Sequence, residues 1–193
     1  MEQVRNTWPL SGFRILLASY AEALNHMEPL DPHGFVLRYA AERFGLSESD
    51  GELFWETLTI PPELIVNGKP ATSASIAAMR ETVEAAVAKM KSLQPETNSN
   101  EFEHFRLMLD IRLHYLKSKE VEARFNSADF SGDDRDGIIA DLESLIGETK
   151  DLDRRFAKLN RGYLYDTEIA QQNMIRNRKL LLLHRRLTGN RTL

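Results

Sequence analysis

The chain has 193 residues and a net charge of −4, from 25 basic and 29 acidic side chains. Apolar residues make up 42% of it and charged residues 28%, a balance that excludes a disordered or membrane-embedded protein. There is no cysteine, which excludes disulfide bonds, a thiolate nucleophile and thiolate metal sites.

The chain shows no sign of a targeting or membrane segment. Its start, Met-Glu-Gln-Val-Arg, lacks the basic region and apolar run of a signal peptide. The longest uninterrupted apolar runs are about four residues, as at 180–183, whereas a span needs about 20. We therefore expect a cytosolic protein without a membrane partner.

Two short helices are predicted first. Apolar residues at helical spacing favour a helix over 13–25. Asp31 can accept hydrogen bonds from the free N–H groups of a second helix, and Pro32 suits its first position. Gly45 is a natural stop for that helix.

A third short helix begins at Ser47 and ends before Pro61-Pro62. The segment 59–73, which contains three prolines and an Asn-Gly pair, is predicted to be an irregular connection. We place the boundary between two parts there: a small helical cap at 1–58 and a bundle at 74–193.

Four long helices follow, joined by polar loops. Apolar residues three or four apart predict them at 75–93, 101–125, 138–160 and 166–187. No strand pattern is present. Long helices joined by short loops favour antiparallel packing, so the predicted fold is all-α, a small cap followed by an antiparallel bundle.

One loop imitates a calcium site. Gly132, Asp134, Asp136 and Gly137, with Glu143 further on, follow the spacing of a calcium-binding loop. The first ligand position is a glycine, which has no side chain, and the next helix is expected to start inside the loop. The acids are better explained by the favourable field at a helix N-terminus.

Other chemistry is not indicated. No two histidines share the four-residue spacing of a helical metal site, and no phosphate-binding loop or serine elbow is present. We predict no catalytic residue, no metal and no cofactor. The early aromatic residues, Tyr20 included, are expected to lie mostly in the core.

Charge is distributed unevenly. Residues 154–193 carry ten basic and two acidic side chains, a net +8, so residues 1–153 carry −12. A basic last helix could contact nucleic acid or another anion. We favour charge complementarity within the chain, because an acidic body repels phosphate, and predict no nucleic-acid partner.

Two residues are candidate partner contacts. Arg176 falls on the inward stripe of the last helix, where it needs a buried partner. An ion pair is the favoured interpretation, and a contact with another domain is the alternative. Trp8 precedes the first helix and is predicted to be exposed where a partner domain would cover it.

Several segments share a pattern with one enzyme family. Residues 31–46 read DPHGFVLRYAAERFGL, and 53–58 read LFWETL. Residues 152–164, then Glu168 and the helix end at 183–187, continue the pattern. Together they resemble the helical region after the catalytic barrel in bacterial family 20 β-N-acetylhexosaminidases.

The resemblance implies that the chain corresponds to a non-catalytic part of such an enzyme. These enzymes hydrolyse N-acetylated amino sugars with substrate assistance, using an adjacent Asp-Glu pair on an eight-stranded barrel. This chain contains no Asp-Glu dipeptide and is too short to hold a barrel of about 250 residues. No catalytic residue carries over.

The leading hypothesis is a non-catalytic accessory domain that packs beside a glycoside hydrolase barrel, in cis or in trans. It predicts an exposed apolar patch around Trp8 and the first helix. The alternative is a free-standing helical interaction module, which could be a homodimer and which predicts a polar exterior apart from one symmetric interface. An anion-binding role of the basic last helix is the third hypothesis.

Overall fold

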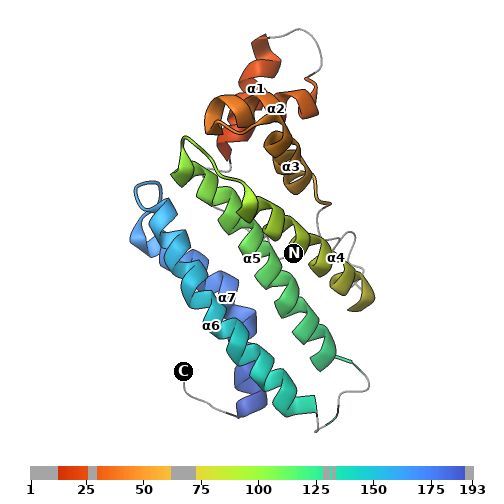
Figure 1. Ribbon diagram of the computed structural model, residues 1–193. Helices are drawn as coiled ribbons and strands as arrows, with labels where there is room; N and C mark the ends of the chain where they lie inside the picture. The colour runs from red at the N-terminus through yellow and green to blue at the C-terminus, as the bar shows by residue number, and fades with distance from the viewer. Residues whose placement is uncertain (1–12, 26–29, 62–72, 128–130, 132–133, 190–193) are drawn as a thin grey trace.

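The computed structural model describes residues 13–25, 30–61, 73–127, 131 and 134–189. Every regular element in these ranges is a helix, so the all-α prediction is confirmed (Figure 1). None of these helices is both long and apolar enough to cross a membrane. Their bounds are α1 Phe13–Asn25, α2 Pro32–Phe44, α3 Glu48–Leu58, α4 Ser73–Ser92, α5 Ser99–Phe125, α6 Asp134–Asn160 and α7 Asp166–Thr188.

The ends of the short helices follow the local chemistry of the sequence. The Asp31 carboxylate accepts hydrogen bonds from the backbone N–H groups of His33 and Gly34, both at 3.1 Å. Gly45 ends α2 in the left-handed conformation, with φ of 70°. The Ser47 hydroxyl accepts the Asp50 N–H at the start of α3. These predicted caps are confirmed.

Three of the four long helices begin before their predicted starts, most of all α6. This helix begins at Asp134, four residues before the predicted Ile138. The Asp134 carboxylate accepts hydrogen bonds from the Ser131 backbone N–H at 3.3 Å and hydroxyl at 3.0 Å. Because carboxylates near a helix N-terminus stabilise it, the acidic stretch forms the first turn of α6.

Helix α5 lies at the centre of the bundle (Figure 1). One of its faces, with Phe105 and Leu109, packs on α4 and the cap helices. The opposite face, with Leu107 and Ile111, packs on Phe156 of α6 and on α7. A further cluster closes the far end of α5, α6 and α7. The predicted stripe of α5 is thus one of two buried faces.

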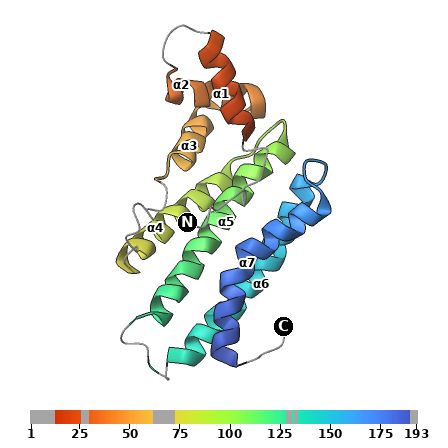
Figure 2. The ribbon, with the colours of Figure 1, turned by 180° about the vertical axis from the view of Figure 1, so that it is seen from behind.

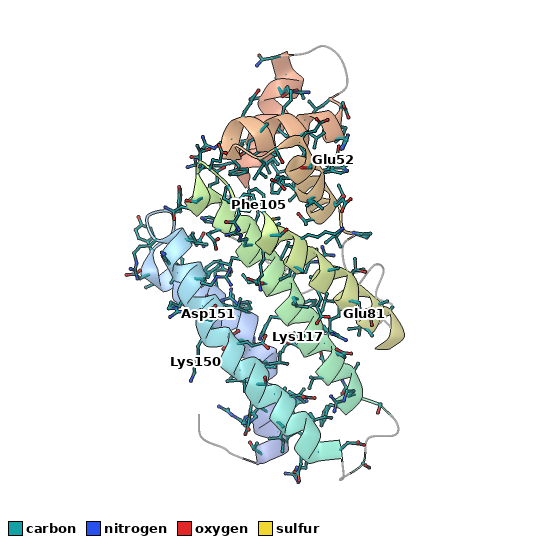
Figure 3. The ribbon with its side chains drawn as sticks, viewed as in Figure 1. Glu52, Glu81, Phe105, Lys117, Lys150 and Asp151 are labelled. Atoms are coloured by element: carbon teal, nitrogen blue, oxygen red, sulfur yellow. The ribbon has the colours of Figure 1, made fainter. Side chains whose placement is uncertain are left out.

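The cap and the bundle share one aromatic core. The rings of Phe44 and Phe54 contact Phe102 and Phe105 of α5, with ring centres 5.1–6.0 Å apart. Figure 3 shows Phe105 where α5 meets the cap helices, whereas Lys150 lies on the outer side of α6. The division into 1–58 and 74–193 stays a prediction, with this core spanning both parts.

Candidate interaction surface

Helix α1 is held against the body by its inner face. Ile15 and Ala18 pack against the edge of the aromatic core. The Arg14 guanidinium lies 3.4 Å from the Glu101 carboxylate, and Glu22 forms an ion pair with Arg38 of α2. Both charges of the described helix are therefore paired within the chain.

The outer face of α1 is a stripe of large apolar side chains. It consists of Leu16, Leu17, Tyr20 and Leu24, each 59–69% exposed. At 100° per residue these four positions fall on one side of the helix, opposite Ile15 and Ala18. We call them the α1 stripe. The expectation of a core position for Tyr20 is wrong, because the inner face of α1 is narrow and formed by smaller residues. Contiguous exposed apolar residues of this kind mark surfaces that another molecule covers.

Glu101 is the point where α1, α2 and α5 meet. Its side chain is 8% exposed, and its carboxylate accepts hydrogen bonds from the Tyr39 hydroxyl at 2.9 Å and from Arg43 Nη2 at 2.7 Å. Burial alone would raise the pKa of Glu101, but the hydrogen bonds from Arg43 and Tyr39 outweigh it and hold that pKa below its usual value. With both oxygens engaged, the carboxylate acts as a structural anchor for α1.

His104 lies one turn further along α5 and is also buried. Burial lowers the pKa of its imidazole to about 4, because a charged ring would lose its hydration there. On the other side of the anchor, Arg14 Nη2 donates to the Tyr163 hydroxyl at 3.1 Å, which joins α1 to the turn before α7. Arg14 thus fixes the position of α1 through both Glu101 and Tyr163.

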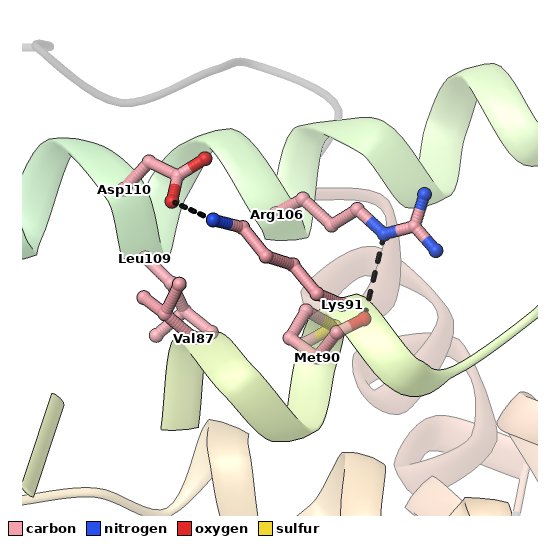
Figure 4. A pocket seen from close by; sticks show the side chains of 6 residues that line it. All are labelled: Val87, Met90, Lys91, Arg106, Leu109 and Asp110. Carbon is pink, nitrogen blue, oxygen red and sulfur yellow. Dashed lines mark hydrogen bonds and ion pairs between the residues drawn. The ribbon is translucent and has the colours of Figure 1, made fainter. Parts of the chain in front are cut away.

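The pocket in Figure 4 is small. It lies between α4 and α5, where Lys91 Nζ is 3.9 Å from the Asp110 carboxylate and Arg106 Nε donates to the Met90 carbonyl. It encloses almost no volume of its own, whereas ligand pockets hold about 300–1,000 Å³. Its lining residues are Val87, Met90, Lys91, Arg106, Leu109 and Asp110.

Arg176 forms the ion pair that its inward position predicts. Its side chain is 6% exposed and pairs with Asp153 of α6. It also donates to Asn173 Oδ1 at 2.7 Å and lies over the Phe156 ring, 5.1 Å from the ring centre. The ion-pair interpretation is thus confirmed, and a role of Arg176 as a partner contact stays a prediction. Trp8, the other candidate, lies outside the described residues.

The acidic residues of the calcium-like segment lie along helix α6. Gly132 lies outside the described residues, Asp134 and Asp136 belong to the first turn of α6, and the Glu143 carboxylate is 3.6 Å from His184 Nε2. Across the described ranges, no three histidine or acidic side chains come close enough to hold a metal ion. The helix-start interpretation of these acids agrees with this geometry.

Comparison with known proteins gives no relatives. No family model matches the chain, and no curated protein or solved structure matches it either. The hexosaminidase resemblance therefore stays a prediction. The α1 stripe is the surface with the strongest functional signal, and the sequence predicts its helix but not which of the apolar residues face outward. The Glu101 anchor carried no sequence signal, because its partners lie 58 to 87 residues away.

Proposed function

We propose that this chain is a non-catalytic helical interaction module that docks through the α1 stripe. The observation that supports the proposal is the exposure of four large apolar residues on one short helix whose inner face is anchored to the body. Burying a leucine side chain is worth about 1.5–3 kcal/mol, so covering this stripe provides a driving force for association.

A second copy of the chain is the partner that the chemistry of the stripe favours. In a two-fold symmetric dimer each residue meets the same surface on the other copy, so a charged face would repel itself. The α1 stripe contains no charge, and the helix's Arg14 and Glu22 are engaged in ion pairs with Glu101 and Arg38. Two stripes in antiparallel contact would bury apolar side chains without burying an unpaired ion.

A glycoside hydrolase barrel is the second candidate partner. The accessory-domain hypothesis requires an apolar patch on the first helix, and the α1 stripe has this character. The proposal of a β-N-acetylhexosaminidase-type barrel, in cis or in trans, rests on the resemblance in residues 31–46, 53–58 and 152–164. A cytosolic location is part of the same proposal.

The oligomeric state of the purified chain tests the proposal. Light scattering behind size exclusion should give a dimer for the wild type and a monomer for Leu17→Lys, which places a charge on the stripe. Lys158→Glu, an exposed change on α6, serves as the control and should remain dimeric. Circular dichroism verifies that both variants keep the helical fold.

Hydrophobic-dye binding on the same samples separates the candidate partners. A wild-type dimer and a Leu17→Lys monomer support a second copy as the occupant, because Leu17 lies on the α1 stripe. A wild-type monomer whose strong dye binding falls in Leu17→Lys supports a missing partner such as the barrel. A wild-type monomer that binds no dye would overturn the docking role of α1.

A further inference from the structure

Helix α7 carries a second exposed apolar surface, separate from the α1 stripe. It consists of Met174, Ile175, Leu181 and Leu182, which are 36–62% exposed. Met174 and Leu181 are seven residues apart, as are Ile175 and Leu182, so they form two rows along the helix. Figure 2 shows α7 on the near side of the molecule, with no other helix in front of it.

A basic row runs between the two apolar rows. Arg178 follows Met174 by four residues and precedes Leu182 by four, which places it in the middle of the outward face. Arg185 continues the same row seven residues on, where it is half-buried, whereas Arg178 is exposed. Within the described part of the chain Arg178 forms no ion pair, and 169–189 contains no acidic residue. The face is therefore apolar at its sides and positively charged along its centre.

This arrangement favours one kind of occupant. A bilayer would accept the apolar rows but would surround Arg178 with hydrocarbon. A nucleic acid would neutralise Arg178 but would leave four apolar side chains against phosphates. A second copy bound through α7 would place one basic row against another, with no acidic residue of 169–189 to pair with either. A helix with an acidic row between two apolar rows satisfies both features of the face.

We propose that the outward face of α7 docks an amphipathic helix of an acidic partner protein. The apolar rows of that helix cover Met174, Ile175, Leu181 and Leu182, and its carboxylates pair with Arg178 and Arg185. This surface differs from the α1 stripe in charge and in position. The chain would then present two docking faces with different partner chemistry.

A pair of synthetic peptides tests the proposal on the full chain. The first is a three-heptad helical peptide with leucine in two rows and glutamate in the row between them. The second has lysine in place of each glutamate. Fluorescence anisotropy measures the binding of both peptides to the wild type, to Arg178→Glu and to Lys158→Glu. Both substitutions reverse one exposed charge, and only the first lies on the proposed face.

We expect the wild type and Lys158→Glu to bind the glutamate peptide with equal affinity. Arg178→Glu should bind it about tenfold or more weakly and should bind the lysine peptide better than the wild type does. Equal binding of the glutamate peptide to all three proteins would overturn the proposal. Failure of that peptide to bind, with sedimentation of the wild type on phosphatidylserine vesicles, would assign the face to a membrane instead.

Leu17→Lys separates this proposal from the function proposed for α1. Its binding of the glutamate peptide should equal that of the wild type, because α7 is unchanged. Loss of peptide binding in this variant would mean that the peptide occupies the α1 stripe, which would overturn the assignment to α7.

Discussion

At the scale of single residues, Glu101 is the charged group on which the position of α1 depends. Glu101→Gln removes the charge that Arg43 and Arg14 share and leaves the Tyr39 hydroxyl with a weaker acceptor. We expect the free energy of unfolding, measured by urea denaturation, to fall by about 2–3 kcal/mol. Glu56→Gln removes an exposed ion pair with Lys89 and should cost less than about 1 kcal/mol. Equal losses in the two variants would contradict the anchor role.

His104 predicts how stability depends on pH. Its pKa of about 4 in the folded chain lies below the value of about 6.5 expected when unfolded, so the unfolded chain takes up the proton first. The contribution of His104 is fully present above about pH 6.5 and is lost as the pH falls toward 4. The loss is on the order of 2–3 kcal/mol.

The variant His104→Gln tests this dependence, because glutamine does not titrate. Urea denaturation between pH 7 and 4 should give a shallower decline of stability than in the wild type. In the wild type, the charges of Glu101 and Glu103 raise the pKa of His104, whereas the charge of Arg14 lowers it. A decline in His104→Gln as steep as in the wild type would remove His104 as the cause.

At the scale of the helices, two glycines give opposite expectations. Gly147 lies within α6, and a Cβ there would meet nothing within 4 Å, so Gly147→Ala should stabilise the chain by up to about 1 kcal/mol. At Gly51 a Cβ would lie 3.1 Å from Leu37 Cδ2, where α3 crosses α2. Thermal unfolding should show a higher Tm for Gly147→Ala and an unchanged or lower Tm for Gly51→Ala. The reverse order would contradict the packing of α2 on α3.

Helix ends differ in how well the sequence predicts them. Local hydrogen bonds and backbone conformation determine the caps at Asp31, Gly45 and Ser47, so the sequence predicts them. The sequence predicts the start of α6 four residues too late, because acidic residues in 134–137 suit both a solvated loop and a helix N-terminus. Only the hydrogen bonds from Ser131 to Asp134 decide between these alternatives.

At the scale of the whole molecule, α5 shows where the spacing of apolar residues fails to predict which faces of a helix are buried. A surface helix has one apolar face, and the sequence indicated one, through Phe102, Phe105 and Leu109. The second buried face contains His104 and His114, which break the apolar pattern. The His114 imidazole hydrogen-bonds the Leu145 carbonyl of α6 at 3.0 Å, and burial lowers its pKa. A central helix buried on two sides is therefore hard to recognise from one sequence.

The spacing of apolar residues is also insufficient to predict the two candidate surfaces. An apolar stripe at helical spacing predicts a helix face but does not say whether the chain itself covers that face. For α7 the sequence predicts the inward stripe. The outward apolar rows around Arg178 are not recognised, because polar residues interrupt their spacing. For α1 the apolar residues were recognised, and only the placement of α1 at one end of the molecule leaves Leu17 and Tyr20 uncovered (Figure 1).

The most direct test of the central claim, that a second copy covers the α1 stripe, is thiol labelling, because the natural chain has no cysteine. Ala21→Cys places a thiol beside the stripe without altering it, and Lys150→Cys places one on the outer side of α6 (Figure 3). We expect the maleimide labelling rate at position 21 to fall as the protein concentration rises, with no change at position 150. A rate at position 21 that is independent of concentration and equal to the rate at 150 would contradict association through α1.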